Sequence, residues 1–263
     1  MISEMIQIEH ICKKFRKKSQ DIVVLEDISF EIREREFVSI VGPSGCGKTT
    51  LLNIVAGLEK PTSGRVLING QVSSTSPNIG VCFQDAPLFP WKTVLDNVEL
   101  ALKVRNRNDA KSGAKAYLRA VGLLDFADFY PKELSGGMKQ KVAIARALAL
   151  ESEILLLDEP FGDLDAQTRA LMQEDMLRIR QDYGKTALLV THSIDEAVFL
   201  SDRVIIFSSL PGKIVKIVDV DLPERSPEIR SQAKFSEIRY KIWEIVRSEI
   251  VSPTQKPIGQ FID

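Results

Sequence analysis

The chain has 263 residues, of which 44% are hydrophobic, and a formal net charge of −1. That is enough for one large domain or two small ones with a real core, and the near-zero charge argues against a bulk nucleic-acid binder, which would carry a basic surplus. With no apolar run near the length of a membrane span, no signal-peptide pattern and three cysteines without C-x-x-C spacing, we expect a cytoplasmic protein in a reducing compartment. Any association with a membrane is then expected to come through a partner.

The chain before Phe37 is predicted to form strands joined by turns. Residues 6–10 alternate between apolar and polar side chains, and residues 25–32 do so again. Between them, the basic run 13–20 is expected to be an exposed hairpin or loop. Phe15 lies in this run, ahead of the phosphate-binding pattern described next. It can stack on a purine, because every base offers a π-face; the alternative is a hairpin residue that packs on the sheet.

The stretch Gly42–Thr50 matches G-x-x-x-x-G-K-[ST], the phosphate-binding loop. Its glycines allow backbone N–H groups to wrap closely around a polyphosphate. Residues 36–41 form an apolar run of the buried-strand type and residues 51–56 continue as an apolar helix, so strand, loop and helix have the required order. We expect Lys48 to contact the outer phosphates and the Thr49 hydroxyl to bind Mg²⁺. The predicted nucleotide-binding residues here are Gly42, Pro43, Ser44, Gly45, Cys46, Gly47, Lys48, Thr49 and Thr50.

The chain then changes from strands to helices. Strands are predicted at residues 65–70, ending in an Asn-Gly turn, and at residues 79–83. The second strand ends at Gln84, whose side chain can bind Mg²⁺ or orient a water; the alternative is a solvated turn residue. From residue 93 to about residue 129 the periodicity is helical, which indicates an inserted helical subdomain. Its entrance at residues 87–91 is unusually apolar for a loop, so we expect a partner surface there, with burial inside the insertion as the alternative.

A second candidate anion site precedes the next helix, which is predicted from about Met138 to Leu150. Ser135, Gly136 and Gly137 stand at its N-terminus, where free backbone N–H groups attract anions. Alone this signal is weak, because a serine before a helix is usually a plain N-cap.

Two later strands end in polar side chains. The apolar run 154–159 ends in Asp158, placed to hold Mg²⁺, and Glu159, placed to polarise a water for attack on a phosphate. The alternative is a solvated acidic turn. The strand at residues 186–191 is closed by His192, at a strand end where sheets of this kind place ligands. We expect His192 to contact the γ-phosphate, although a lone histidine is more often structural.

The remaining segments complete the fold. A helix is predicted from Ala166 to about Tyr183, a strand from Arg203 to Ser208, and a closing helix or helix pair from Ser226 to Ile250. The long helix is expected to place Leu171, Met172, Asp175, Met176 and Ile179 near one face. The closing helix carries the apolar stripe Ile238, Ile242, Ile245 and Val246.

In this order the motifs resemble one family, the ATPase subunits of ABC transporters. Gly42–Thr50 matches its Walker A motif, Leu134–Met138 its signature and Ile154–Glu159 its Walker B motif. Gln84, residues 162–165 and His192 match its Q-, D- and H-loops, and Phe15 resembles its base-stacking aromatic. The resemblance implies an α/β fold: a P-loop NTPase ABC cassette with a RecA-like, mostly parallel core, an antiparallel β region and an inserted helical subdomain. Residues 1–263 would be a single ABC ATP-binding domain, with residues 1–86 and 151–210 as core, 87–150 as helical subdomain and 211–263 as C-terminal extension.

The resemblance also implies an activity, MgATP hydrolysis that drives a membrane permease. The catalytic residues would be Glu159, His192, Gln84 and Lys48, and the Mg²⁺ ligands Thr49, Gln84 and Asp158. Two copies would sandwich ATP, with Ser135, Gly136 and Gly137 of one copy covering the nucleotide held by the other. The implied partners are permease subunits and a periplasmic or lipoprotein substrate-binding protein, with no nucleic acid, at the cytoplasmic face of the inner membrane.

A finer resemblance is to importers of nitrate, aliphatic sulfonates, taurine and related small anions. It is carried by residues 88–94, 134–140, 160–169 and 210–212. Thiamine-precursor importers share much of the sequence of these segments. Met138 and Asp163 depart from the wider family's usual residues. Two alternatives remain: a soluble ABC ATPase of translation or DNA repair, which would carry two cassettes or a long coiled coil, and a non-hydrolysing regulator, which Glu159 and His192 argue against.

Overall fold

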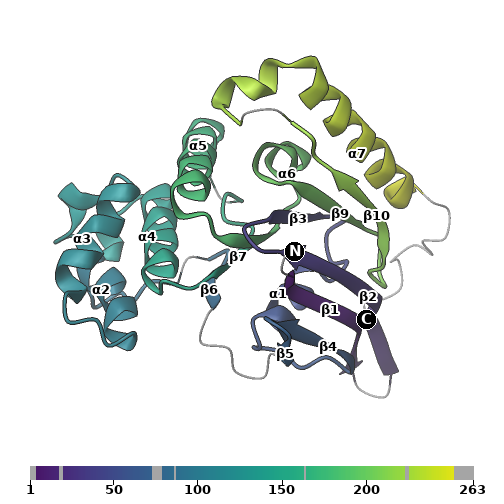
Figure 1. Ribbon diagram of the computed structural model, residues 1–263, viewed down its shortest axis with the longest axis horizontal. Coiled ribbons are helices and arrows are strands. Elements are labelled where there is room, and N and C mark those ends of the chain that lie inside the picture. The colour runs from purple at the N-terminus through teal and green to yellow at the C-terminus, as the bar shows by residue number, and fades with distance from the viewer. Residues whose placement is uncertain are drawn as a thin grey trace, which may run out of the picture.

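A computed structural model of the chain describes residues 4–17, 20–72, 79–85, 87–162, 164–222 and 225–251. Its centre is a six-stranded sheet in the order β10-β9-β3-β8-β7-β6, in which only the β10–β9 pair is antiparallel (Figure 1). The strands are β3 (Phe37–Val41), β6 (Ile79–Cys82), β7 (Ile154–Asp158), β8 (Thr186–Val190), β9 (Arg203–Phe207) and β10 (Ile214–Asp219). The mostly parallel core that the sequence predicts is therefore confirmed.

Both faces of this sheet are buried. In β7, Leu155 and Leu157 belong to one hydrophobic cluster and Ile154 and Leu156 to the other. Successive strand side chains point to opposite faces, so an unbroken apolar run fits a strand that is covered on both sides. One face is covered by the helices α5 (Ala166–Tyr183), α6 (Ile194–Leu200) and α7 (Ala233–Val251), and the other by α1 (Lys48–Val55) and a second sheet (Figure 1).

The second sheet is antiparallel, in the order β2-β1-β4-β5. It consists of β1 (Glu4–Lys17), β2 (Gln20–Arg33), β4 (Ser63–Ile68) and β5 (Gln71–Val72). The expectation of an exposed basic loop is wrong at Lys13, which lies in β1 and is only 8% exposed. Its ammonium donates to the Glu59 carboxylate (2.6 Å) and to the carbonyl of Lys60 (2.8 Å), which satisfies the buried charge. Lys18 and Ser19 lie outside the described residues.

The helices of the predicted insertion gather at one end of the molecule, beyond β6 (Figure 1). They are α2 (Val94–Val104), α3 (Ala110–Ala120) and α4 (Gly136–Ala149), with the short 3₁₀ turns η1 (Leu124–Phe126) and η2 (Pro131–Glu133). Helix α4 begins two residues earlier than predicted, because the Ser135 hydroxyl caps it by accepting from the Met138 N–H (3.3 Å).

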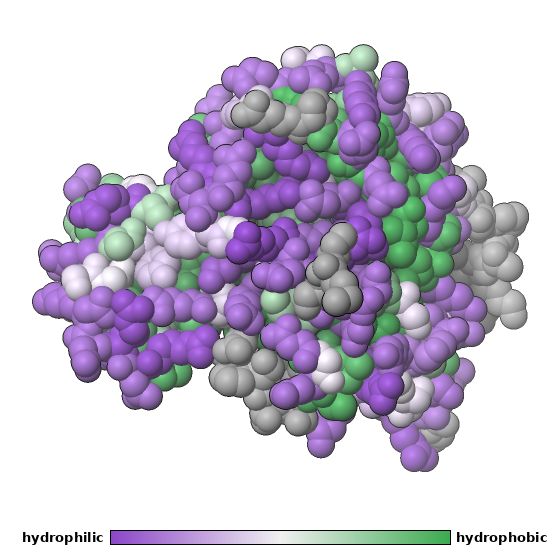
Figure 2. All heavy atoms as spheres, in the orientation of Figure 1, coloured by the Kyte–Doolittle hydropathy of each residue, from purple (hydrophilic) through white to green (hydrophobic). Residues whose placement is uncertain are grey.

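The C-terminal part packs back on the sheet through η3 (Pro227–Ser231) and α7. The predicted stripe on α7 is confirmed: Ile242 is fully buried, and Ile238, Ile245 and Val246 pack against the core. The prediction for α5 is wrong at Leu171, which is 61% exposed. Figure 2 shows a mostly hydrophilic face with a hydrophobic area where Figure 1 places β10. Within the described ranges, no helix has the length and apolar character needed to cross a membrane.

Candidate active site

The phosphate-binding loop joins β3 to α1 and needs glycine at two positions for different reasons. Gly47 has a φ of 100°, in the left-handed region, and a Cβ there would lie 2.7 Å from a Leu25 methyl carbon. Gly42 has no such φ, but its Cβ would come within 2.9 Å of the Phe207 carbonyl oxygen. At both positions the loop packs too closely against the rest of the chain to admit a side chain.

Lys48 is the first residue of α1 and is almost fully buried. Its ammonium donates to the carbonyl oxygens of Gly42 (2.9 Å) and Pro43 (3.0 Å), both within the loop. Gly47, the N-cap, supplies no side-chain acceptor, so the first N–H groups of α1 are available to an anion. A phosphate entering the loop would meet the helix N-terminus and a lysine that already lies inside the cradle.

Asp158 ends β7 next to Thr49, whose hydroxyl donates to its Oδ1 at 3.0 Å. Burial raises the pKa of the Asp158 carboxyl, while the Thr49 hydrogen bond and the Lys48 charge act in the opposite direction. A hydroxyl and a carboxylate are hard oxygen donors, which fit Mg²⁺; that ion usually takes one or two protein ligands plus phosphate oxygens and waters. The described residues hold no cluster of three or more His, Cys, Asp or Glu suited to a metal.

Glu159 and His192 meet across two neighbouring strands. The Glu159 N–H donates to the carbonyl of Val190 (2.9 Å), and its carboxylate lies 3.0 Å from His192 Nδ1. Glu159 has a φ of 44°, a conformation that costs a non-glycine residue energy and is often found at functional sites. The two residues that the sequence predicts as base and phosphate contact are therefore brought together.

Gln84, at the end of β6, lies near the same carboxylate. A hollow of about 150 Å³ is lined by Gln84, Gly136, Glu159 and Gly162 among others. Gly136, in the segment that matches the signature, thus lines the same hollow as Glu159 of its own chain. A Cβ at Gly136 would meet nothing within 4 Å, whereas one at Gly137 would lie 2.6 Å from a Thr168 methyl carbon.

Phe15 lies in β1 and is 40% exposed. The Lys13 ammonium lies 4.6 Å from its ring centroid, a cation–π contact that fixes the ring. The exposed part of the ring leaves room for a planar group to stack. Asp163, the unusual residue of the predicted D-loop, lies outside the described residues.

Two hydrogen-bond networks that support the site were not predicted from the sequence. Arg169 donates to the carbonyl oxygens of Phe161 (3.1 Å), Gly162 (3.3 Å) and Leu164 (2.7 Å), and so holds the loop after Glu159. The second network is centred on Glu196, which accepts hydrogen bonds from Thr191 Oγ1 (2.5 Å) and Gln173 Nε2 (3.0 Å).

The motif Ser193-x-x-Glu196, a serine followed three residues later by glutamate, could have marked the start of α6. The sequence carries no signal for the outer member of the network, Arg230, which donates to the Gln173 side chain and lies over the Phe199 ring (3.9 Å).

Comparison with known proteins identifies the family. The family model described as "ABC transporter" matches residues 25–162. The chain belongs to the ABC transporter family. An ABC transporter ATP-binding protein of Methanocaldococcus jannaschii is 47% identical over 249 residues, which are 94% of this chain and 92% of that protein. An aliphatic sulfonates import ATP-binding protein of Bacillus cereus is 44% identical over 238 residues, 90% of this chain and 94% of that one.

A nitrate import ATP-binding protein of Synechococcus elongatus is 46% identical over 84% of this chain but only 35% of its own length. Among solved structures, a dimeric ATP-binding cassette in a post-hydrolysis state with ADP and Pi shares 34% identity and a TM-score of 0.75, covering 83% of this chain and all of that one. The predicted family, the α/β P-loop cassette fold and the role of an ABC transporter ATPase are thus confirmed.

Proposed function

We propose that this ABC transporter ATPase energises a bacterial importer of a small anion, such as an aliphatic sulfonate, taurine or nitrate. The observation that carries the proposal is the alignment with the sulfonate import protein, which covers nine-tenths of both chains. The nitrate import protein is as similar over a shorter part. Of the four segments that resemble this subfamily, residues 88–94 and 134–140 lie in the helical insertion and none lies in the nucleotide loop.

We infer the role of each residue from the geometry of the site. Phe15 stacks on the adenine, and the backbone N–H groups of residues 42–50 together with Lys48 hold the phosphates. Thr49, Asp158 and Gln84 hold Mg²⁺, which when bound supplies positive charge against the phosphate oxygens. Phosphoryl transfer to water depends mainly on positioning and charge stabilisation, which suits a loop whose lysine is already in place.

Glu159 acts as the base that orients and deprotonates the attacking water. His192 Nδ1 holds the Glu159 carboxylate at 3.0 Å, and the other ring nitrogen is then available for the γ-phosphate. Gln84 lines the same hollow as Glu159 and can contact both the water and the metal.

The active unit is proposed to be a homodimer, in which Ser135, Gly136 and Gly137 of one copy cover the ATP of the other. It would bind permease subunits at the cytoplasmic face of the inner membrane, as a peripheral protein, together with a periplasmic or lipoprotein substrate-binding protein. We keep the division into a core (1–86 and 151–210), a helical subdomain (87–150) and a C-terminal extension (211–263) as part of this proposal.

Transport by the reconstituted complex tests the function. The chain would be co-expressed with the membrane proteins encoded beside it, and uptake of labelled taurine, an alkanesulfonate, nitrate and a thiamine precursor would be measured in proteoliposomes. We expect ATP-dependent uptake of one of the three anions, abolished by Lys48→Ala. Uptake of the thiamine precursor alone would show that the ATPase role is right and the cargo wrong. Hydrolysis that the membrane proteins do not stimulate, with no uptake of any tested solute, would favour a soluble ATPase.

A further inference from the structure

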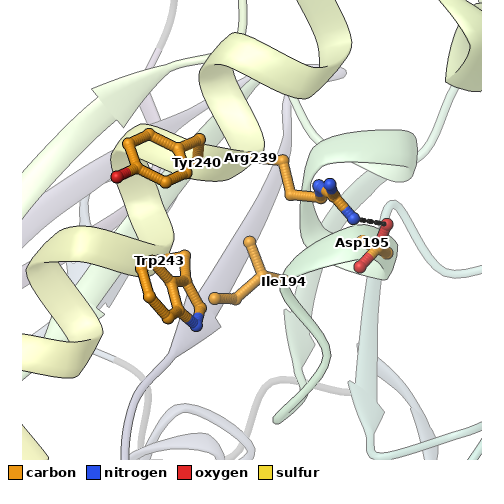
Figure 3. Close-up of a pocket in the computed structure, with 5 residues that line it drawn as sticks. All are labelled: Ile194, Asp195, Arg239, Tyr240 and Trp243. Carbon is orange, nitrogen blue, oxygen red and sulfur yellow. Dashed lines mark ion pairs between the residues drawn. The ribbon is translucent and has the colours of Figure 1, made fainter.

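A hollow of about 310 Å³ lies between the start of α6 and the middle of α7, apart from the nucleotide site. Figure 3 shows the five residues that line it, Ile194 and Asp195 from α6 and Arg239, Tyr240 and Trp243 from α7. Its size is at the lower end of the range for small-molecule pockets, about 300–1,000 Å³.

One wall of the hollow is aromatic. Tyr240 and Trp243 are 56% and 43% exposed, and their ring centroids are 5.7 Å apart. Adjacent exposed aromatic side chains are a recurrent sign of a binding surface. The Arg247 guanidinium lies 5.1 Å from the Trp243 ring centroid, a cation–π contact between neighbouring turns of α7.

The opposite side carries one positive and one negative group. Arg239 Nη1 and Asp195 Oδ1 are 3.6 Å apart, which is too long for a hydrogen bond. Their side chains are 49% and 56% exposed, and an exposed pair of this kind contributes little to stability. Arg239 and Asp195 can therefore separate and each pair with an opposite charge on a ligand.

We propose that this hollow binds a small zwitterionic amino compound, an amino acid or an amino sulfonate. The acid group binds Arg239 and the ammonium binds Asp195, while the short carbon chain between them faces the aromatic wall. A simple anion would be repelled by Asp195, and a simple cation by Arg239, whereas a zwitterion satisfies both charges in one small molecule. A nucleotide is disfavoured because its multiple negative charges would face the Asp195 carboxylate.

Binding of a ligand in the hollow should also affect His192 in the active site. Asp195 comes three residues after His192, and the neighbouring Glu196 is tied to Thr191 by a buried 2.5 Å hydrogen bond. The first turn of α6 thus joins the hollow to the histidine as one stiff unit. A ligand that links Asp195 to α7 restricts the adjustment of His192 as its free ring nitrogen approaches the γ-phosphate, and hydrolysis slows. This second step rests on the proposed role of His192; the binding step does not.

Tryptophan fluorescence tests the binding step directly. The chain has two tryptophans, so Trp91→Phe leaves Trp243 as the sole reporter. This full-length variant would be titrated with taurine and β-alanine, with ethanesulfonate, which lacks the ammonium, and with ethylamine, which lacks the acid. We expect saturable changes with the two zwitterions and at least about tenfold weaker binding of the other two. Arg239→Gln and Asp195→Asn should each weaken taurine binding by about tenfold, equivalent to about 1.4 kcal/mol, while the exposed control Arg119→Gln should not.

Three results would overturn the inference, each at a different step. If neither zwitterion gives a saturable change up to its solubility limit, the hollow does not bind such compounds and the inference is wrong. Ethanesulfonate binding as tightly as taurine, unaffected by Asp195→Asn, would show a simple anion site instead. For the second step, saturating taurine should lower the kcat of phosphate release at least about twofold in the wild type but not in Arg239→Gln; binding with an unchanged kcat would refute the link to His192.

Discussion

Glu159 is held at two points: its backbone N–H donates to the Val190 carbonyl, and its carboxylate Oε2 lies against His192 Nδ1. Glu159→Gln keeps the size of the side chain but removes the base. We expect kcat to fall by at least about 10²-fold, in the range typical of general-base loss, with ATP affinity nearly unchanged. Phosphate release and an equilibrium ATP titration measure the two effects separately. Loss of ATP binding in the variant would contradict the assigned role.

Glu196 offers a second residue-scale test, because burial raises the pKa of its carboxyl. The folded state then holds the proton more tightly than the unfolded state, so the group favours folding at low pH, and this contribution is lost as the pH rises through the raised pKa. The Glu196→Gln variant has no carboxyl at this position and therefore lacks this pH dependence. We therefore expect the wild type to gain stability relative to this variant as the pH falls from neutral.

The size of that gain can be read from thermal unfolding. For a chain of this length, about 1 kcal/mol corresponds to about 2–4 °C in Tm, so melts followed over a pH series can detect the relative gain. Glu244→Gln, at an exposed position of α7, is the matched control and should track the wild type at every pH. A constant difference between wild type and Glu196→Gln would show that the pKa of Glu196 is the same in the folded and unfolded states.

At the scale of elements, the loop before α2 is anchored to that helix and yet exposes a tryptophan. The Asn97 side chain accepts from the Phe89 N–H (2.8 Å) and donates to the Phe89 carbonyl (3.2 Å), which fixes the loop on the helix. Trp91 nevertheless projects outward and is 72% exposed, with its ring 5.6 Å from that of Phe89. An anchored loop that presents an exposed tryptophan fits a docking surface better than an insertion core, which favours the first of the two alternatives drawn from the sequence.

We expect Trp91→Ala to reduce permease-stimulated hydrolysis by about tenfold or more, the usual effect of truncating an interface anchor. Basal hydrolysis by the isolated subunit should stay within about twofold, because the side chain packs little in its own chain. Leu171→Ala, equally exposed on α5, serves as the control for loss of a surface apolar group. If Trp91→Ala instead lowers basal activity and thermal stability together, the loop is structural.

The sequence predicted the elements of the site better than their contacts. Strand, loop and helix around Lys48 follow from local periodicity, and Glu159 and His192 were both expected at strand ends. Burial of Lys13 could not be foreseen, because its partner Glu59 is 46 residues away in the chain. The same holds for Arg230, whose link to α6 runs through Gln173 on a third element. Such contacts depend on tertiary packing, which local pattern does not encode.

At the scale of the whole molecule, the two anion-binding helix starts belong to different parts of the fold. Lys48 begins α1, between the two sheets, whereas Gly136 begins α4, at the end occupied by the helical insertion (Figure 1). Gly136 has open space where a Cβ would stand, so its backbone can approach another molecule. A head-to-tail pair with closed two-fold symmetry is the simplest arrangement that brings the two starts to one ATP.

We therefore expect dimerisation to depend on nucleotide. Without ATP the subunit should be largely monomeric, and Glu159→Gln with MgATP should shift toward dimer in sedimentation or light scattering, because a ligand shared by the interface stabilises it by linkage. Adding Ser135→Arg to that variant should prevent the shift while leaving ATP affinity of the monomer nearly intact, since Ser135 makes its own contact only with the α4 N-terminus. Ser112→Arg, which places the same charge on the exposed surface of α3, should still dimerise. Loss of ATP binding by the Ser135→Arg monomer would mean that the signature acts on the nucleotide of its own chain, and the two-copy site would be wrong.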